Sequence, residues 1–214
     1  MRPVAGTSPV AAPNGSPTMR SMKTTAGLAL ALAAGVAGAA DLAAGAAKAE
    51  TCTACHGPAG ISKLPETPSL AGQPDGFLQW QLVYFRGGRR KSPVMQPIAA
   101  TLSDDDIRNL AAHFAAQKPP PPEATGTEVQ PAIRNVGQRL AQGHRCASCH
   151  TDDYSGTQAT PRLVGQREDY LLKALREFKS GARTGGGVAS MADVVYPLGD
   201  DELRALAHFT AHAR

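Results

Sequence analysis

Apolar residues recur at helical spacing in matching places of two separate stretches of the chain. Residues 68–90 read PSLAGQPDGFLQWQLVYFRGGRR, and residues 161–183 read PRLVGQREDYLLKALREFKSGAR. In both, a Pro-x-Leu-x-Gly-Gln turn leads into a run whose apolar side chains lie three or four positions apart, as on one face of a helix. We therefore expect one long helix in each stretch and treat the chain as an internal repeat.

A second pair of matching segments, also with helical spacing, follows further along the chain. Residues 102–114 read LSDDDIRNLAAHF, and residues 198–209 read LGDDELRALAHF. Ser103 with Asp106 is a capping-box pattern at a helix start, and Gly199 with Glu202 is a weaker form of it. A third helix is expected in each half within 41–52 and 132–146. Because no stretch alternates apolar and polar residues long enough for a strand, the predicted fold class is all-α, with three main helices in each half.

A proline-rich stretch separates the two halves. Residues 117–131 read QKPPPPEATGTEVQP, and four consecutive prolines favour an extended, semi-rigid spacer and exclude a helix. We therefore predict a leader over 1–39, a first domain over 40–117, a linker over 118–131 and a second domain over 132–214.

The N-terminal region indicates export. From Met19 the chain reads MRSMKTTAGLALALAAGVAGAADLAAG, with Arg20 and Lys23 as a positive start, an apolar run over 26–37 and an Ala-x-Ala signal over 37–39. This is the plan of a secretory signal peptide, so we expect a periplasmic protein. The run is short and rich in alanine for a membrane span, and a retained N-terminal anchor is the alternative.

Charge argues against nucleic acid as a partner. The whole chain has 22 basic and 18 acidic residues, and its first 39 residues hold three of the basic ones and no acid. An exported form would thus carry 22 − 3 = 19 basic and 18 acidic residues, and would lack the dense basic face that nucleic acid requires. Aromatic residues make up only 5%, so a staple such as a large cofactor is expected in cores of this size.

All four cysteines belong to two copies of one motif. Residues 51–56 read TCTACH and residues 145–150 read RCASCH. Two cysteines three positions apart lie on one side of a helical turn, where they can form thioethers to one haem, and the following histidine then lies under the ring as an iron ligand. The predicted residues for two covalently attached haem c groups are Cys52, Cys55 and His56 in the first half, and Cys146, Cys149 and His150 in the second.

Two other readings of the cysteines remain open from the sequence. A thioredoxin-like redox pair would require a βαβ context, of which the pattern shows no sign. A single zinc ion bound by four thiolates would bridge both halves and leave the two histidines unexplained.

Two methionines are the candidate sixth iron ligands. Met95 lies 39 residues after His56 and Met191 lies 41 residues after His150, and they are the only methionines after the signal region. We expect each in a loop before the last helix of its half. The alternative is that both methionines only fill gaps in the apolar core. This alternative has more weight for Met191, because its loop has three extra glycines.

Other residues are assigned supporting roles. The carbonyls of Pro68 and Pro161, at matching offsets from the two motifs, are candidate acceptors for the second ring nitrogen of each haem histidine, although ordinary turn prolines would look the same.

The remaining histidines are expected to be exposed or to point away from iron: His113, His144, His208 and His212. A basic cluster precedes Met95 and suits either propionates, an acidic partner or a solvated face: Arg86, Arg89, Arg90 and Lys91.

These motifs together resemble the dihaem cytochrome c4 family, over about residues 41–214. The resemblance rests on CTACHG, PSLAGQ, FRGGRRKSPVMQPIAATLSDDDI and LAAHF, with weaker counterparts in the second half. It implies two tandem cytochrome c-like domains, two His/Met haems facing each other, and periplasmic electron transfer toward a terminal oxidase, often at the membrane surface. The second half departs from the pattern, because the glycine after its haem histidine is absent and its Met191 loop is rewritten.

The expected function is that of an electron carrier and not an enzyme. Methionine as the sixth ligand raises the reduction potential and leaves no open iron site, and no acid/base pair or nucleophile stands out. Redox proteins, namely a membrane oxidase and a dehydrogenase, are the expected partners, and no small-molecule substrate is expected. The alternatives are a dihaem subunit of a periplasmic dehydrogenase, for example of sulfide, and an oxidoreductase in which one haem opens to substrate.

Overall fold

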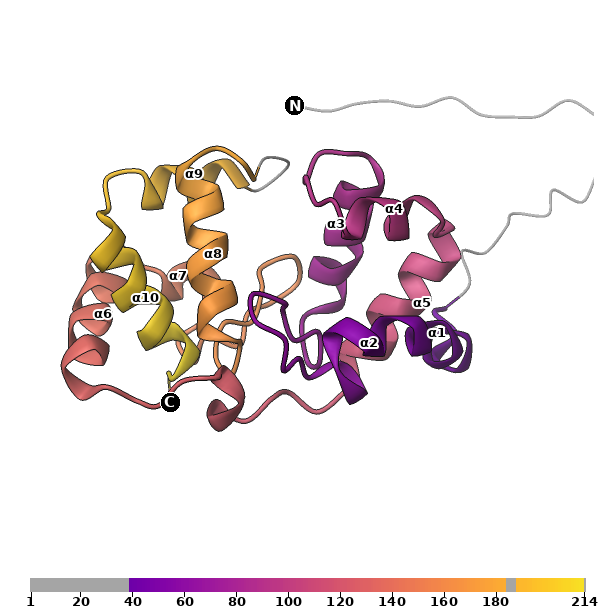
Figure 1. The fold of residues 1–214 in the computed structure, drawn as a ribbon, viewed down its shortest axis with the longest axis horizontal. Coiled ribbons are helices and arrows are strands. Elements are labelled where there is room, and N and C mark those ends of the chain that lie inside the picture. Colours follow the sequence, from indigo (N-terminus) through magenta and orange to yellow (C-terminus); the bar gives the residue numbers. More distant parts are fainter. Residues whose placement is uncertain (1–38, 184–187, 214) are drawn as a thin grey trace, which may run out of the picture. The chain divides into compact units, whose positions relative to one another are not determined.

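The computed structural model describes residues 39–183 and 188–213 (Figure 1). The predicted leader and signal peptide, and the glycines before Met191, lie outside the described residues. Within them the chain forms helices and two isolated β-bridges, but no strand, which confirms the all-α prediction. None of the helices in these residues is long and apolar enough to cross a membrane.

The described residues of each half form five α-helices, three that the sequence predicted and two others, the second and the fourth. In the first half the helices are α1 (Leu42–Ala49), α2 (Thr53–His56), α3 (Asp75–Arg86), α4 (Met95–Ala100) and α5 (Asp104–Ala115). In the second half they are α6 (Pro131–Gly143), α7 (Ala147–His150), α8 (Glu168–Lys179), α9 (Val188–Val195) and α10 (Asp200–Ala211). A 3-10 turn, Pro122–Thr125, lies in the connection between the halves.

The last helix of each half begins at the predicted cap. The Ser103 hydroxyl accepts from the Asp106 N–H at 3.0 Å, and the Asp106 carboxylate accepts from the Ser103 N–H at 3.0 Å. At α10 only the second of these bonds exists, between the Gly199 N–H and the Glu202 carboxylate at 2.7 Å, because glycine has no side chain. The acidic first turns also complement the positive helix N-termini.

Glycine permits the first and last helices of each half to cross closely. A Cβ placed on Gly45 of α1 would lie 2.2 Å from the Asn109 carbonyl oxygen of α5. A Cβ on Gly137 of α6 would lie 2.0 Å from the Ala205 carbonyl oxygen of α10. Only a residue without a side chain allows backbones to approach this closely.

These crossings hold the main apolar core of each half. The first core includes Leu78 from α3 together with Ile107, Leu110 and Phe114 from α5. The second is built on α10 in the same way and includes the following buried side chains: Leu198, Leu203, Leu206, Phe209 and, from α9, Val195. The cores fix the longer helices and thereby position the short helices that carry the cysteine motifs.

Candidate haem-binding sites

The first cysteine motif places a buried histidine with a defined proton position. Cys52 closes a 3-10 turn, and Cys55 and His56 follow in α2. The His56 Nδ1 atom lies 2.8 Å from the Pro68 carbonyl oxygen. Because a carbonyl can only accept, Nδ1 carries the proton, and Nε2 keeps a lone pair with which to bind a metal. Burial lowers the pKa of His56, and the Pro68 hydrogen bond opposes it only in part, so the ring is neutral at pH 7.

The second motif has the same geometry. Cys149 and His150 belong to α7, and His150 is buried with only 6% of its surface exposed. Its Nδ1 atom lies 3.0 Å from the Pro161 carbonyl oxygen. Burial lowers the pKa of His150 as well. Each half therefore presents a neutral imidazole whose Nε2 lone pair is available.

The thiols do not have the properties of a redox pair or a zinc site. All four cysteines are free, and burial raises the pKa of the Cys52 and Cys146 thiols above 9.0, away from the thiolate form that a redox pair needs. In the described part of the chain, the groups of three or more close histidine, cysteine or acidic ligands do not include a cysteine. One zinc ion bound by four thiolates is therefore not supported.

The two methionines lie on helices and not in loops, which corrects the sequence-based expectation. Met95 is the first residue of α4, and its N–H donates to the Ser92 hydroxyl at 3.0 Å. Met191 lies within α9, partly buried against the apolar core of the second half. Pro97 follows Met95 in the first turn of α4, where its missing N–H costs no hydrogen bond.

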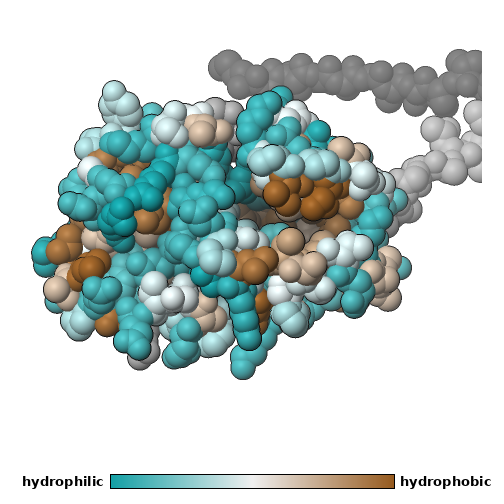
Figure 2. All heavy atoms as spheres, in the orientation of Figure 1, coloured by the Kyte–Doolittle hydropathy of each residue, from teal (hydrophilic) through white to brown (hydrophobic). Residues whose placement is uncertain are grey.

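An apolar surface adjoins Met95. Among the exposed large apolar side chains, Trp80 lies on α3, Val94 precedes α4 and Ile98 lies on α4, with 50%, 57% and 45% of their surfaces exposed. Figure 2 shows apolar atoms gathered over these two helices. Soluble proteins rarely expose such a patch without function, and its chemistry fits the face of a porphyrin.

Two buried arginines from matching positions pair across the halves. Arg90 and Arg183 form an antiparallel bridge, and each has less than a tenth of its surface exposed. The Gln81 side-chain oxygen accepts from both guanidiniums, at 2.7 and 2.9 Å, and Arg90 also donates to the Tyr170 hydroxyl at 3.1 Å. Burial lowers the pKa of Arg183 to about 10. Two buried positive charges that bond to neutral oxygens fit the carboxylates of haem propionates.

The basic cluster before Met95 therefore divides. Arg90 is buried, whereas Arg86 binds the Asp104 carboxylate at 2.6 Å at the start of α5. Arg89 and Lys91 are exposed.

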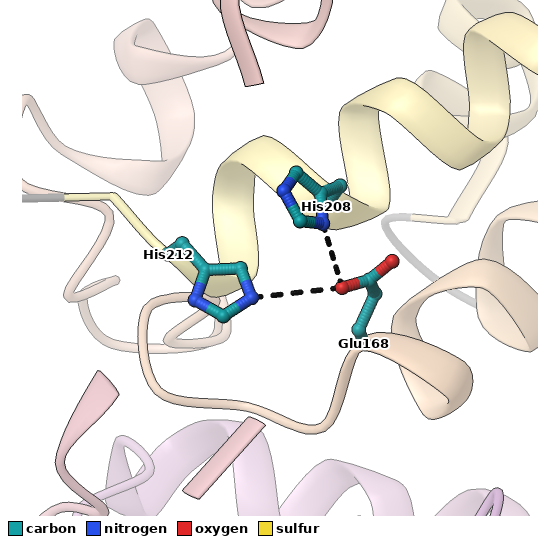
Figure 3. A group of neighbouring side chains, drawn as sticks. All are labelled: Glu168, His208 and His212. Carbon is teal, nitrogen blue, oxygen red and sulfur yellow. Dashed lines mark hydrogen bonds and ion pairs between the residues drawn. The ribbon is translucent and has the colours of Figure 1, made fainter. Parts of the chain in front are cut away.

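A separate cluster joins α8, α10 and the connection between the halves (Figure 3). The His208 Nδ1 and His212 Nε2 atoms lie 2.8 and 3.6 Å from one oxygen of Glu168. The exposure expected for His208 and His212 was wrong, since they expose only 1% and 3% of their surfaces. Counted from the caps of α5 and α10, His208 takes the place of Ala112, which is only partly buried, so the burial of His208 comes from its contacts with Glu168 and Gln130.

The hydrogen bonds argue against a metal ion in this cluster. The Gln130 N–H donates to His208 Nε2 at 3.0 Å, which holds the imidazole proton on Nδ1, facing Glu168. A metal ion on Nδ1 would require that proton on Nε2, directly opposite the Gln130 N–H. His212 Nε2 lies 3.2 and 3.1 Å from the hydroxyls of Thr125 and Thr127. The cluster thus ties the connection to α8 and α10.

Two family models match the two halves. Residues 135–213 match the model for cytochrome c, and residues 38–114 match the model for the subunit III of cbb3-type cytochrome c oxidase. Cytochrome c4 of Azotobacter vinelandii is 34% identical over 188 residues, covering 79% of this chain and 87% of that protein.

The chain belongs to the cytochrome c4 family. It is a cytochrome c4-like dihaem electron-transfer protein of two cytochrome c domains, with two covalently attached haem c groups on the pairs Cys52/Cys55 and Cys146/Cys149. The structure of reduced cytochrome c4 from Pseudomonas stutzeri matches with a TM-score of 0.75 and 31% identity, over 82% of this chain and all of that one.

Other relatives of this cytochrome c4 family member bear a different name. A thiosulfate dehydrogenase electron acceptor of Stutzerimonas stutzeri is 35% identical over 173 residues, covering 77% of this chain and 79% of that protein. The thiosulfate dehydrogenase structure from Marichromatium purpuratum matches with a TM-score of 0.71 and 30% identity, over 81% of this chain and 40% of that one.

Sequence reasoning missed two glutamines at the contact between the cytochrome domains. Gln73 and Gln166 end the two Pro-x-Leu-x-Gly-Gln turns, and both are buried. Each bonds to the backbone of the other half, at Arg162 and Ser69 respectively. The sequence did contain a signal. The two Pro-x-Leu-x-Gly-Gln turns repeat a glutamine beside proline, leucine and glycine, and a polar side chain repeated at the same place in both halves indicates a hydrogen-bond partner.

Proposed function

We propose that this protein is a periplasmic electron carrier with two six-coordinate haems. His56 and Met95 are the iron ligands in the first half, and His150 and Met191 are the ligands in the second. Single electrons pass from a donor, a dehydrogenase or a quinol-oxidising complex, to a terminal oxidase. The leader ends near residue 39, and the two domains span 40–117 and 132–214, joined by the linker over 118–131.

The observation that carries this proposal is the matched state of the two motif histidines. Both are buried, both carry the proton on Nδ1 through a proline carbonyl, and both follow a pair of free thiols. Such a ring offers Nε2 to a metal in a fixed orientation, with its basicity raised by the second hydrogen bond. A methionine in each half completes the set, and six ligands leave no site for a substrate.

The residues of this chain then have distinct tasks. Bound haem supplies reversible one-electron chemistry at its iron. The carbonyls of Pro68 and Pro161 hold the histidine rings in place, so that the ligands need little movement between the oxidation states. Arg90 and Arg183 balance the negative charge of the propionates inside the protein, which stabilises the reduced state. Apolar side chains over α3 and α4 exclude water from the first haem.

The test is the near-red absorption of the oxidised holoprotein, matured with its haems and recorded with a haem count. The sulfur-to-iron band should have the intensity of two methionine-ligated haems, and Met95→Leu and Met191→Leu should each remove one half of it. Retention of the full band in either variant would show that the replaced methionine is not a ligand. A high-spin signal from the second haem in the unmodified protein would instead favour the oxidoreductase with one open iron.

A second function is favoured by the names of the relatives. Two relatives are called thiosulfate dehydrogenase electron acceptors, and the thiosulfate dehydrogenase structure contains a region similar to 81% of this chain. On this alternative the donor is a thiosulfate dehydrogenase, and the chain is its partner subunit or acceptor. Stopped-flow reduction of the oxidised protein by such an enzyme plus thiosulfate would be fast and saturable, whereas a carrier for another donor would be reduced only slowly.

A further inference from the structure

The two halves bind each other through a reciprocal pair of glutamines. The Gln166 side chain forms two hydrogen bonds with the backbone of Ser69: its oxygen accepts from the N–H at 2.8 Å, and its nitrogen donates to the C=O at 2.8 Å. The Gln73 side chain does the same to Arg162, at 3.0 and 2.9 Å. Both glutamines are about 95% buried. If either side chain were removed, no water would be at hand to bond to the backbone N–H and C=O that it now satisfies.

The peptide that each glutamine contacts also serves a haem histidine. The Ser69 N–H and the Pro68 C=O belong to one planar peptide unit. The Pro68 oxygen accepts from His56 Nδ1 at 2.8 Å, while the Ser69 N–H donates to Gln166 of the other half. A chain of hydrogen bonds therefore runs from Gln166 through this peptide to the first motif histidine.

The second half contains the same chain in the opposite direction. The Arg162 N–H donates to Gln73 at 3.0 Å, and the Pro161 C=O of the same peptide unit accepts from His150 Nδ1 at 3.0 Å. The glutamine of the first half thus acts on the histidine of the second half.

We propose that Gln73 and Gln166 are positioning residues that tune the haem of the opposite half. This inference rests on the proposed ligation of iron by His56 and His150. When the glutamine oxygen accepts from the peptide N–H, the peptide is polarised and its carbonyl becomes a stronger acceptor. The stronger acceptor draws the Nδ1 proton and makes Nε2 a more basic ligand, which favours ferric iron. Each glutamine therefore lowers the potential of the haem across the interface.

The arrangement also couples the haem environments to the contact between the halves. If the halves separate, both peptides lose their glutamine at once, and both potentials rise. A partner protein that loosens or tightens this contact would then change both haems together, without touching either iron.

The experiment measures each haem separately in the holoprotein. Gln166→Leu keeps a side chain of similar volume but without polar atoms, and so removes both hydrogen bonds to Ser69. It should raise the midpoint potential of the first haem more than that of the second, in a redox titration followed by assigned haem-methyl resonances. It should also move the His56 Nδ1–H resonance of the ferrous protein upfield, as expected for a weaker hydrogen bond. Gln73→Leu should produce the mirror image, at the second haem and His150.

Control variants separate tuning from a general loss of structure. Gln79→Leu removes a bond within α3, to Asp75 at 2.7 Å, and Gln142→Leu changes an exposed side chain of α6. Neither should shift the haems in a crossed pattern. Gln166→Glu covers the case in which Gln166→Leu does not fold, because it keeps the acceptor for the Ser69 N–H and should leave the His56 Nδ1–H resonance in place or move it downfield.

The outcomes distinguish this inference from the proposed function. Equal shifts at both haems, larger shifts in the half that carries the substitution, or no shift would overturn the crossed tuning. Loss of the methionine band or of the Nδ1–H resonances in the unmodified protein would instead refute the ligand set on which the inference rests.

Discussion

Gly57 and Thr151 occupy the same place in the two halves, directly after the motif histidine, and both have a positive φ. Their backbone angles are φ 78°, ψ 166° and φ 69°, ψ 160°. This region is strained for any residue other than glycine. The Thr151 hydroxyl offsets part of the strain by accepting from the N–H groups of Ser155 and Gly156 at 3.1 and 3.2 Å. The second half therefore keeps the turn although it lacks the glycine.

Replacing Gly57 with alanine should destabilise the protein severely. The added Cβ would lie 1.9 Å from the Ile61 carbonyl oxygen, so the backbone must move, and the positive φ adds strain. We expect Gly57→Ala to lower the free energy of unfolding by about 2–4 kcal/mol. Urea unfolding of the holoprotein, followed by its haem absorption, measures this loss.

Gly181→Ala is the matched control for that variant. Gly181 also has a positive φ, of 71°, but a Cβ there meets no atom within 4 Å. It should cost only the strain of the backbone conformation, about 1 kcal/mol. If the two variants lose the same free energy, then the contact with Ile61 does not determine the requirement for Gly57.

The helix crossings give a second prediction. Gly137→Ala places a Cβ 2.0 Å from the Ala205 carbonyl oxygen and should cost about 1–3 kcal/mol, since α6 must move away from α10. Gly143→Ala, on the same helix, meets nothing within 4 Å and should be neutral or stabilising by up to about 1 kcal/mol. Thermal unfolding of both variants checks the difference, and an equal loss of stability in Gly137→Ala and Gly143→Ala would mean that the close crossing of α6 and α10 does not determine the cost.

The sequence predicted what depends on local pattern. Helical spacing predicted the six longer helices, and the cap at Ser103 predicted where α5 begins. The two covalent haems followed from the two six-residue cysteine motifs, and the family followed from these together with PSLAGQ, LAAHF and the longer stretch around Met95. Sequence reasoning was least successful where a residue acts at long range.

The errors have identifiable physical causes. His208 was expected to be exposed because a histidine near a helix end usually is, but Glu168 on α8 and the Gln130 N–H of the connection bind its two ring nitrogens and bury it. Met95 and Met191 were placed in loops because proline precedes the first and glycines precede the second. In the structure Met95 is the first residue of α4, and Met191 lies within α9. The partners of Gln166 lie 97 residues away, a distance at which no local pattern operates.

The buried arginines give a prediction for the reduction potentials. Arg183 exposes 6% of its surface and lies beside Arg90. Removal of a buried positive charge favours the more positive, ferric state, so Arg183→Leu should lower the midpoint potentials. Arg183→Lys retains a charge and should lower them less, and Arg204→Leu, on the exposed side of α10, should have little effect. A rise in potential with Arg183→Leu would contradict the role of this charge.

The cluster in Figure 3 makes stability depend on pH. Burial lowers the pKa of His212 below its ordinary value of 6.5; the neighbouring His208 and Arg134 lower it further, and Glu168 opposes them. The unfolded chain therefore binds more protons than the folded protein below about pH 6.5. Stability should be full above that pH and should fall as the pH drops toward the lowered value, by at most about 1.4 kcal/mol per pH unit for one proton.

Urea unfolding of the holoprotein between pH 7.5 and 5 tests this dependence. The strongly depressed carboxyls Asp153 and Asp200, each with a pKa of about 2, lose their contribution only at lower pH and do not contribute in this range. His56 and His150, when bound to iron, do not titrate either. His212→Gln keeps a hydrogen-bonding side chain but cannot titrate, so its stability should be flatter across the range. An unchanged slope in His212→Gln would mean that another group takes up the proton, whereas a flat profile in the unmodified protein would mean that the imidazole remains as easily protonated inside this cluster as in water.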